Sequence, residues 1–473
     1  MKNLRVWLVG VFGLMAAVGS GLAQSSVSAA TATQIDAAAA KVLAATGVPS
    51  ASVAVVQGGQ VAYVKAYGKA RLEPVMEATP QMQYSIGSIS KQFTAAMVLF
   101  LVQDGKMSLD DVVGKYLPGL TRANEVTVRQ VLSMTSGYQD FWPEDYVMTS
   151  MMKPTDPQGI LDVWGKKPLD FEPGTLWQYS NTNYVIAGRI VEIVGGKPLM
   201  EQLQARIFKP LKMTGVYNSD ASRLPANDPT GYYQHALGPL RPAPQEGMGW
   251  MFAAGELAMP ASDLALWNIS LMNRSLLAPA SYDAMFAEVK LKDGKGTGYG
   301  LGVDVGERNG HKFVAHGGEV SGFVAQNTVF LTDKAAVTVL TNEDASSAAA
   351  ALARAIEPLV LGGSATVADD ALKHAAEARG LVIFTGLQEG KIDRGQLTQL
   401  CSDYFTQEAL DDFASSLKPL GAPGSFTQTY ETKRGGMTFR VFKVDFPNKS
   451  LRVTVYEEPD GKIEQYLVIA PGS

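Results

Sequence analysis

The stretch Tyr84-Ser-Ile-Gly-Ser88-Ile-Ser-Lys91-Gln-Phe93 runs directly into an apolar segment that continues to Val102. From Phe93 onward, apolar side chains fall on every face of a helix, and such a helix lies inside a protein. Ser88 and Lys91 are three residues apart, so they share a face at its N-terminal end. A serine there is most often an inert cap, but a lysine is costly to bury unless it is paired or neutral. The stretch therefore predicts a buried helix that begins with a serine beside a lysine.

This pair of side chains suits acyl transfer. A serine hydroxyl is a weak nucleophile until a base removes its proton, and burial lowers the pKa of a lysine so that its neutral amine can be that base. The N–H groups of the helix N-terminus also stabilise developing negative charge. The spacing alone is weak, because Ser150-Met-Met-Lys153 and Ser415-Ser-Leu-Lys418 share it. In both of these the lysine precedes a proline, which disfavours helical geometry, so Ser88 is the expected nucleophile.

Composition excludes several classes of function. The chain has 473 residues, 46% apolar and 18% charged, which is ordinary for a soluble globular protein of more than one domain. A net charge of −5 argues against a nucleic-acid partner. Cys401 is the only cysteine, so internal disulfides and cysteine-based metal sites are excluded, and the four histidines lack HExxH spacing. We expect no metal and no cofactor.

The N-terminus resembles an export signal. Lys2 and Arg5 precede an uncharged run from Val6 to Val18, and small residues follow up to Ala23. The alternative is a membrane anchor, since the uncharged run approaches spanning length. We expect residues 1–23 to be a cleaved signal peptide, the mature chain to be periplasmic or secreted, and no membrane span to remain.

Residues 24–361 predict one antiparallel sheet flanked by helices, with an inserted helical lobe, which is an α/β (α+β) fold class. The expected strands are 50–56, 61–67, 298–305, 312–316, 322–331 and 336–341, and the first two form a hairpin across Gln57-Gly58-Gly59-Gln60. The expected helices are 30–45, a capped start at 107–113, 126–134, 185–194, 262–272 and 345–361.

A small, polar segment at 362–370 predicts a linker, and residues 371–473 predict a separate α+β domain. Its expected helices are 371–389, 395–404 and 407–418, and its expected strands are 425–432, 437–446, 450–457 and 462–469. We find no catalytic residues in it, so a chain ending near Gly363 should keep the chemistry.

Two further stretches carry residues suited to an acyl-transfer site. Tyr179-Ser180-Asn181 places a phenol and an amide together, and a phenol near an ammonium can shuttle a proton or be partly ionised. His316-Gly317-Gly318 places two glycines in a strand, where a ligand can approach the backbone. Taken singly, Tyr179 is more typical of a tethered loop tyrosine and His316 of a hydrogen-bonded strand histidine.

Together these motifs resemble the serine β-lactamase and penicillin-binding-protein superfamily. The nearest branch is that of class C β-lactamases, D-alanyl-D-alanine carboxypeptidases, D-aminopeptidases and β-lactamase-like esterases. The resemblance covers residues 30–361 and also includes Leu132-Ser-Met-Thr-Ser-Gly-Tyr138, Phe171-Glu-Pro-Gly174 and Tyr299-Gly-Leu-Gly302. It implies a β-lactamase/transpeptidase-like fold and a small-molecule or peptide substrate.

The resemblance also implies roles for individual residues. Ser88 would be the acylated nucleophile and Lys91 its base. Tyr179 would share proton transfer to the leaving group, and Asn181 would orient Lys91 and the substrate. The oxyanion hole would consist of the backbone N–H groups of Ser88 and Glu319.

The third motif departs from the family pattern. β-Lactamases and most carboxypeptidases of this family carry Lys-Thr-Gly, and this chain has His316-Gly317-Gly318 in its place. A rival, Lys295-Gly-Thr-Gly298, lies in a glycine-rich stretch that reads as a turn. Histidine here is similar to D-aminopeptidases and several esterase-like members, and its ordinary pKa near ~6.5 leaves it mostly neutral. We therefore expect carboxylated β-lactams to be poorer substrates than neutral esters, and a rise in nitrocefin turnover below about pH 6 would indicate a protonatable His316.

The expected function is therefore an exported serine hydrolase that cleaves small esters or D-amino-acid amides and peptides. One alternative is a β-lactamase or D-Ala-D-Ala carboxypeptidase. Another is a non-catalytic protein that binds or senses cell-wall peptides or β-lactams. By its order of elements, the region 371–473 resembles the NTF2-like fold, which implies an accessory pocket or a homodimer contact.

Overall fold

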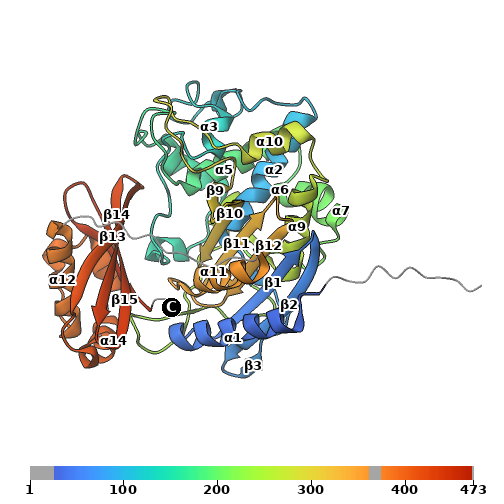
Figure 1. Cartoon of the computed structure of the whole chain (residues 1–473). Helices are drawn as coiled ribbons and strands as arrows, with labels where there is room; N and C mark the ends of the chain where they lie inside the picture. The colour runs from blue at the N-terminus through green and yellow to red at the C-terminus, as the bar shows by residue number, and fades with distance from the viewer. Residues whose placement is uncertain (1–25, 362–373, 471–473) are drawn as a thin grey trace, which may run out of the picture.

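The computed structural model describes residues 26–361 and 374–470 (Figure 1). The expected signal peptide at 1–23 and the expected linker at 362–370 lie outside the described residues. The described chain is a mixed α/β structure with antiparallel sheets and flanking helices, as the sequence predicts. None of its described helices is both long enough and apolar enough to cross a membrane.

A seven-stranded antiparallel sheet, in the order β3-β2-β1-β12-β11-β10-β9, forms the middle of the larger part of the molecule. Its strands are β1 (Ser50–Gln57), β2 (Gln60–Leu72), β3 (Val75–Glu77), β9 (Asp304–Arg308), β10 (His311–Val320), β11 (Phe323–Phe330) and β12 (Ala335–Thr341). β1 and β2 form the predicted hairpin, and Gly58 and Gly59 supply the positive φ values of its turn.

Helices cover both faces of this sheet (Figure 1). α1 (Ala29–Thr46) and α11 (Ala348–Leu361) pack on one face, and α9 (Ala261–Asn273) packs on the other. The other helices of this part are α2 (Ser90–Gln103), α3 (Val128–Leu132), α4 (Pro157–Val163), α5 (Asn181–Gly195), α6 (Leu199–Leu203), α7 (Lys209–Leu211), α8 (Phe252–Gly255) and α10 (Pro279–Phe286). Val53 and Val55 of β1 pack in the apolar cluster of α1 and α11, whereas Ala54 and Val56 join the cluster that holds α2. β1 is therefore buried on both faces, which explains its continuous apolar sequence.

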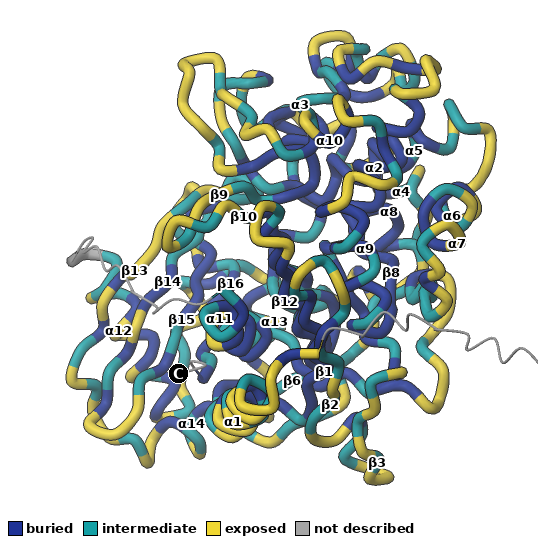
Figure 2. Tube along the Cα trace, turned by 45° about the vertical axis from the view of Figure 1, so that its right-hand side comes forward, coloured by how far each residue is buried: buried dark blue, intermediate teal, exposed yellow. Residues whose placement is uncertain are grey.

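Short elements connect these layers. A three-stranded sheet contains β4 (Tyr84–Ser85), β8 (Leu257–Met259) and β5 (Tyr217–Asn218), and a two-stranded sheet contains β6 (Tyr232–Tyr233) and β7 (Arg241–Pro242). The 3₁₀ turns are η1 (Gly87–Ile89), η2 (Val113–Lys115), η3 (Thr149–Met152) and η4 (Trp164–Lys166), and η5 (Gln204–Phe208) is a single π-helical turn. α2 is buried almost throughout, while α1 exposes one side to solvent (Figure 2).

Three sequence predictions of local structure are wrong. The helix start expected at 107–113 is only the turn η2, because extended Val112 forms a β-bridge with Thr127 instead. The strand expected from 298 begins at Asp304, since Gly298 and Gly302 take positive φ values that interrupt an extended chain. α5 begins at Asn181, four residues earlier than expected.

The C-terminal region, residues 374–470, has an apolar core of its own. Its elements are α12 (His374–Gln388), η6 (Arg394–Gln396), α13 (Gln399–Tyr404), α14 (Gln407–Leu417), η7 (Lys418–Leu420), β13 (Ser425–Arg434), β14 (Met437–Phe446), β15 (Lys449–Glu457) and β16 (Ile463–Ile469). The strands pair in sequence order as an antiparallel sheet, and the three helices lie beside it (Figure 1). The order of elements is the predicted one, and the NTF2-like assignment stays a prediction.

We expect a buried carboxyl group to make stability depend on pH. Glu256, directly after α8, receives one hydrogen bond from Asn218 at 2.7 Å, and its Oε1 has no hydrogen-bond partner among the described residues. Burial raises the pKa of Glu256 to about 8, with Asp220 adding to the rise. Because the folded pKa lies above the unfolded one, this stability is complete below the unfolded pKa and is lost as pH rises through about 8.

Glu256→Gln should therefore reduce the fall in Tm that the parent shows between about pH 5 and about pH 9. Thermal unfolding followed by circular dichroism measures this difference. The control is the same substitution at Glu389, which is exposed and pairs with Lys391. An unchanged Tm slope in Glu256→Gln would contradict the assignment.

Candidate active site

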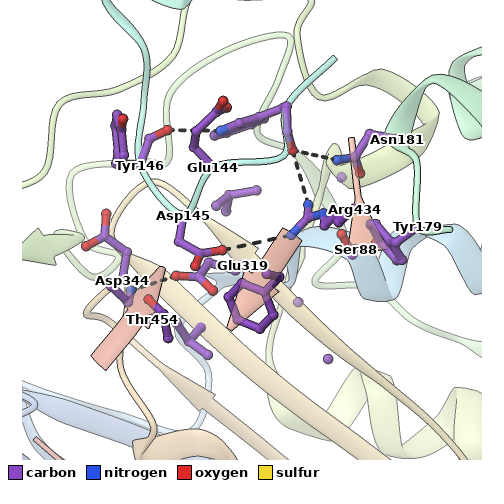
Figure 3. Close-up of a pocket in the computed structure, with 18 of the residues that line it drawn as sticks. Ser88, Glu144, Asp145, Tyr146, Tyr179, Asn181, Glu319, Asp344, Arg434 and Thr454 are labelled. Carbon is purple, nitrogen blue, oxygen red and sulfur yellow. Dashed lines mark hydrogen bonds and ion pairs between the residues drawn. The ribbon is translucent and has the colours of Figure 1, made fainter. Parts of the chain in front are cut away.

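Ser88 lies in the turn η1, directly before α2, at the edge of a cavity of about 490 Å³ (Figure 3). The buried sides of α2 fix this end of the helix inside the core, because Phe93 contacts both Phe208 and Trp267 through its ring. The Ser88 hydroxyl is therefore held on a rigid element and faces open space. This is the placement that the opening stretch of sequence predicts.

The amine of Lys91 is fully buried and lies against Ser88. Its Nζ is 2.8 Å from Ser88 Oγ, 2.7 Å from Asn181 Oδ1 and 2.9 Å from the backbone oxygen of Ala254. None of these three groups is a carboxylate. Burial lowers the pKa of Lys91 well below its ordinary value, Asp140 opposes this shift, and Arg434 adds to it.

Tyr179 and Asn181 lie on either side of the start of α5, and the structure brings both to Ser88. The ring centre of Tyr179 is 5.0 Å from Lys91 Nζ, and its hydroxyl is within hydrogen-bonding reach of Ser88. Burial raises the pKa of Tyr179, which Ser88 and Arg434 only partly oppose. Tyr179 is therefore a neutral phenol at neutral pH, and the partly ionised alternative is wrong.

The strand β10 carries His316 to Glu319 past the turn η1. A Cβ atom on Gly318 would lie 1.9 Å from the backbone oxygen of Ile86, and one on Gly87 would lie 2.6 Å from the backbone nitrogen of Glu319. Both glycines are needed for this close approach. It brings the backbone of Glu319 beside that of Ser88, which is the arrangement expected of an oxyanion hole.

His316 is buried and neutral. Its Nδ1 lies 2.5 Å from the backbone oxygen of Gly317, which can only accept, so Nδ1 carries the hydrogen. Nε2 then accepts a hydrogen bond from the Tyr299 hydroxyl at 3.0 Å. Burial, with Lys91 adding to its effect, lowers the pKa of His316 to about 3. The sequence left the protonation state of His316 open; here desolvation penalises the imidazolium and favours the neutral ring.

Residues from both parts of the chain line the cavity. The sequence indicated no site residue in the C-terminal region, but residues of its sheet line the cavity, namely Tyr430, Thr432, Lys433, Arg434, Phe439, Arg452, Thr454, Tyr456, Leu467 and Ile469. Five carboxylate residues also line it, namely Glu144, Asp145, Asp304, Glu319 and Asp344 (Figure 3). Local patterns gave no signal for these residues, because their role depends on contacts between distant segments.

The rival motif around Lys295 and the candidate metal cluster of the described residues both lie outside the cavity. Lys295 is 79% exposed and pairs with Asp293, and it is absent from the cavity lining. Among the described residues, His235, Glu408 and Asp412 form the one cluster close enough to hold an ion. Arg241 already pairs with both of its carboxylates.

Comparison with known proteins agrees with this geometry. A family model described as Beta-lactamase matches residues 35–360. The chain belongs to the beta-lactamase family. A D-aminopeptidase of Brucella anthropi is 29% identical over 286 residues, which cover 59% of this chain and 53% of the relative. The chain thus spans about half the length of that relative. Penicillin-binding protein 4* of Bacillus subtilis is 26% identical, over 66% of this chain and 72% of its own.

Solved structures show the same fold. A D-stereospecific amidohydrolase from Streptomyces sp. has a TM-score of 0.60 at 26% identity and covers 71% of this chain and 99% of its own. An octameric penicillin-binding protein homologue from Pyrococcus abyssi has a TM-score of 0.63 at 21% identity. It covers 93% of this chain and 99% of its own, so this likeness of fold extends into the C-terminal region.

Gly317 and Gly318 of β10 should differ sharply in how well they tolerate substitution by alanine. In Gly318→Ala the new methyl group would meet the backbone of η1 at 1.9 Å and would lie 3.2 Å from the nitrogen of Ser88. We expect kcat for ester hydrolysis to fall about 100-fold or more, as for a lost oxyanion donor, with a lower Tm. Gly317→Ala is the matched control, because its methyl group would meet nothing closer than 3.7 Å. Equal Tm values for the two variants would contradict the close approach.

Proposed function

We propose that this chain is an exported serine hydrolase that works through an acyl-enzyme on Ser88. The observation that carries the proposal is the buried amine of Lys91, 2.8 Å from Ser88 Oγ. A neutral amine has two hydrogens to donate to Asn181 and Ala254 and one lone pair to accept the proton of Ser88. The three neighbours of Nζ thus match the neutral form of a general base.

The steps follow from the positions of these groups. Lys91 accepts the hydroxyl proton as Ser88 Oγ attacks the carbonyl carbon of the substrate. The backbone N–H groups of Ser88 and Glu319 stabilise the oxyanion. Tyr179 donates its proton to the leaving group and is reprotonated by Lys91, so the alcohol or amine departs, an ester remains on Ser88, and the amine is neutral again. Water then hydrolyses that ester by the same route and restores the free hydroxyl.

The charges around the cavity favour one class of substrate. Burial raises the pKa values of Glu144 to about 8 and of Asp304 and Asp344 to about 7, and raises that of Glu319 well above its usual range. An ammonium group among these carboxyls would stabilise their ionised forms, whereas a substrate carboxylate would repel them. Neutral His316 supplies no cation at the position of the family's Lys-Thr-Gly motif, and the cations that line the cavity, Lys433, Arg434 and Arg452, come from the C-terminal strands β13 and β15. This supports D-amino-acid amides and peptides with a free amine, together with small neutral esters.

The relatives' names agree with this class, since they include a D-aminopeptidase and a D-amino acid amidase from Ochrobactrum anthropi. The same charges disfavour the alternative of a β-lactamase or carboxypeptidase, whose substrates carry a carboxylate. The alternative of a non-catalytic sensor has no need for a base, a phenol and a hydroxyl in mutual contact.

The catalytic roles can be tested by substitution. Ser88→Ala should abolish hydrolysis of p-nitrophenyl esters, and Lys91→Ala should cost nearly as much, since the two groups act as a unit. Tyr179→Phe should lower kcat on the order of 100-fold as a lost proton donor, and EDTA should have no effect. The control pair is Ser415→Ala and Lys418→Ala, which share the spacing but not the site.

Labelling with a fluorophosphonate probe, followed by mass spectrometry, locates the nucleophile directly. An adduct on Ser88 supports the acyl-enzyme. Absence of an adduct on the parent protein would favour the sensor, and near-normal kcat in Lys91→Ala would show that another group is the base.

The preference for substrate charge is a separate expectation. We expect kcat/KM for D-alanine p-nitroanilide to exceed that for its N-acetyl derivative about 10- to 100-fold, because one charged hydrogen bond contributes about 1.5–3 kcal/mol. Nitrocefin, which carries a carboxylate, should be poor. His316→Lys should improve nitrocefin relative to neutral esters by a similar factor.

Because the pKa of His316 is about 3, His316 itself should add no rise in nitrocefin turnover as pH falls from about 7 to about 5. A rise in that range should instead reflect protonation of the cavity carboxyls, whose pKa values are about 7 to 8, and should persist in a His316→Gln variant. A parent enzyme that prefers nitrocefin, or a His316→Lys variant with an unchanged ratio, would refute the charge argument.

A further inference from the structure

The tip of the β13–β14 hairpin inserts into the active-site region from the C-terminal side. β13 ends at Arg434, and Gly435 and Gly436 turn the chain with φ values of +59° and +78°. A Cβ atom on Gly435 would lie 3.1 Å from Pro143, so the turn is closely packed on the segment that follows Asp140. This contact joins the C-terminal sheet to the wall of the cavity.

The guanidinium of Arg434 donates hydrogen bonds to three acceptors at that wall and also forms an ion pair with Asp145, at 4.0 Å (Figure 3). Nε donates to Asp140 Oδ2 at 3.2 Å, one terminal nitrogen donates to the backbone oxygen of Trp142 at 3.2 Å, and the other donates to the Tyr456 hydroxyl at 3.1 Å. Its central carbon lies 5.0 Å from the ring centre of Tyr179. The side chain is only 21% exposed. One arginine thus contacts both parts of the molecule.

Asp140 continues the connection toward the nucleophile. Its carboxylate is fully buried, and its Oδ1 accepts hydrogen bonds from both the backbone nitrogen and the Nδ2 of Asn181, at 2.9 and 3.0 Å. This fixes the amide so that Oδ1 of Asn181 faces Lys91 Nζ at 2.7 Å. Rotating the amide would point its N–H₂ group at the amine and leave Asp140 without that donor. The orientation of Asn181 therefore depends on Asp140 and on the backbone oxygen of Trp142, to which Nδ2 also donates at 3.1 Å and which Arg434 binds as well.

We propose that Arg434 is a positioning residue of the active site, which holds Asp140 so that Asn181 presents its oxygen to Lys91. The inference rests on the proposed serine-hydrolase function. The hydrogen-bonded sequence Arg434–Asp140–Asn181–Lys91 connects the C-terminal hairpin to the catalytic base. Without the arginine, a buried carboxylate would lose its cation, which is strongly destabilising for the arrangement around it.

The charge of Arg434 also acts on the base. Asp140 raises the pKa of Lys91, whereas Arg434 lowers it, so the two charges oppose each other at the amine. Removing the arginine leaves the attraction of Asp140 unopposed and raises the pKa of Lys91. Since catalysis needs the neutral amine, activity is lost as pH falls through that pKa, and the loss then begins at a higher pH.

Other groups that face Lys91 do not titrate in the same range. Tyr179 and Tyr184, whose ring centres lie 5.0 and 5.6 Å from Nζ, have pKa values raised by burial and stay neutral. His316 has a pKa of about 3 and also stays neutral. Glu144, Asp304 and Asp344 of the cavity wall do have pKa values of about 7 to 8, but the proposed chemistry on a neutral ester needs none of them. The acid limb of kcat/KM for a neutral ester therefore reports on Lys91.

The test compares Arg434→Met, Arg434→Lys and Arg440→Met in the full chain. Arg440 is the matched control, because it lies on β14 and pairs with Glu431 and Glu457 at 3.0 and 2.9 Å but does not line the cavity. The readouts are kcat and KM for a neutral p-nitrophenyl ester, the acid limb of kcat/KM, and the rate of fluorophosphonate labelling at Ser88.

We expect Arg434→Met to lower kcat and the labelling rate about 10- to 100-fold, as for a slightly misplaced base, and to move the acid limb to higher pH. Arg434→Lys should restore part of kcat and of the labelling rate and should move the acid limb part of the way back. Arg440→Met should change neither the rates nor the acid limb. Combining Arg434→Met with Asp140→Asn removes both charges and should return the acid limb toward the parent's position.

If Arg434→Met does not fold, Asp140→Asn alone still tests the inference, because it should move the acid limb to lower pH. An acid limb that stays in place in the folded variants would overturn it. A change in KM for anionic substrates alone would make Arg434 a substrate-binding residue and would also overturn it. Failure of the parent to label at Ser88 would instead refute the proposed function, which separates the two results.

Discussion

The buried amine of Lys91 is the constraint on which the rest of this structure depends. A charged amine without a carboxylate partner costs several kcal/mol to bury, and this one is surrounded by a hydroxyl, an amide and a backbone carbonyl. The neutral form avoids that cost, so the surroundings must exclude water and keep charges balanced. Four elements meet for this purpose, namely α2, α5, α8 and β10. Both the apolar packing of α2 and the close approach of β10 to η1 help to keep the Lys91 amine buried and neutral.

Local sequence patterns predicted what local physics determines. The all-round apolar spacing of α2 and the Gly58-Gly59 turn each gave a correct element, because burial and positive φ leave a direct trace in composition. The errors at Val112 and Gly298 came from pairings and turns that the apolar pattern does not record. The double glycine of β10 was visible in the sequence, but the backbone that approaches it was not.

In the candidate site, too, local patterns identified some residues and missed those that depend on distant contacts. Identities and spacing were enough to select Ser88 and Lys91, and the family resemblance added Tyr179. The structure brings these three residues together. Asp140 and Arg434 were missed because they are 294 positions apart, and a contact of that range leaves no period or turn signal in either segment. The protonation states of the site residues could not be predicted from the sequence either. His316 has an ordinary side chain, and only its burial and its contact with the Gly317 carbonyl determine that it stays neutral.

The choice of an arginine at the hairpin tip has a physical reason. A lysine there would offer a single flexible ammonium, and burial would favour its neutral form, whereas a guanidinium stays charged in any protein environment. The planar group also meets a carboxylate, a carbonyl and a hydroxyl in fixed directions while it covers the face of Tyr179. A permanent positive charge is what Asp140 requires, because the carboxylate would otherwise attract a proton to Lys91. In this proposal the C-terminal region is therefore part of the electrostatic balance that keeps the base neutral, and a lysine in place of the arginine would restore only part of it.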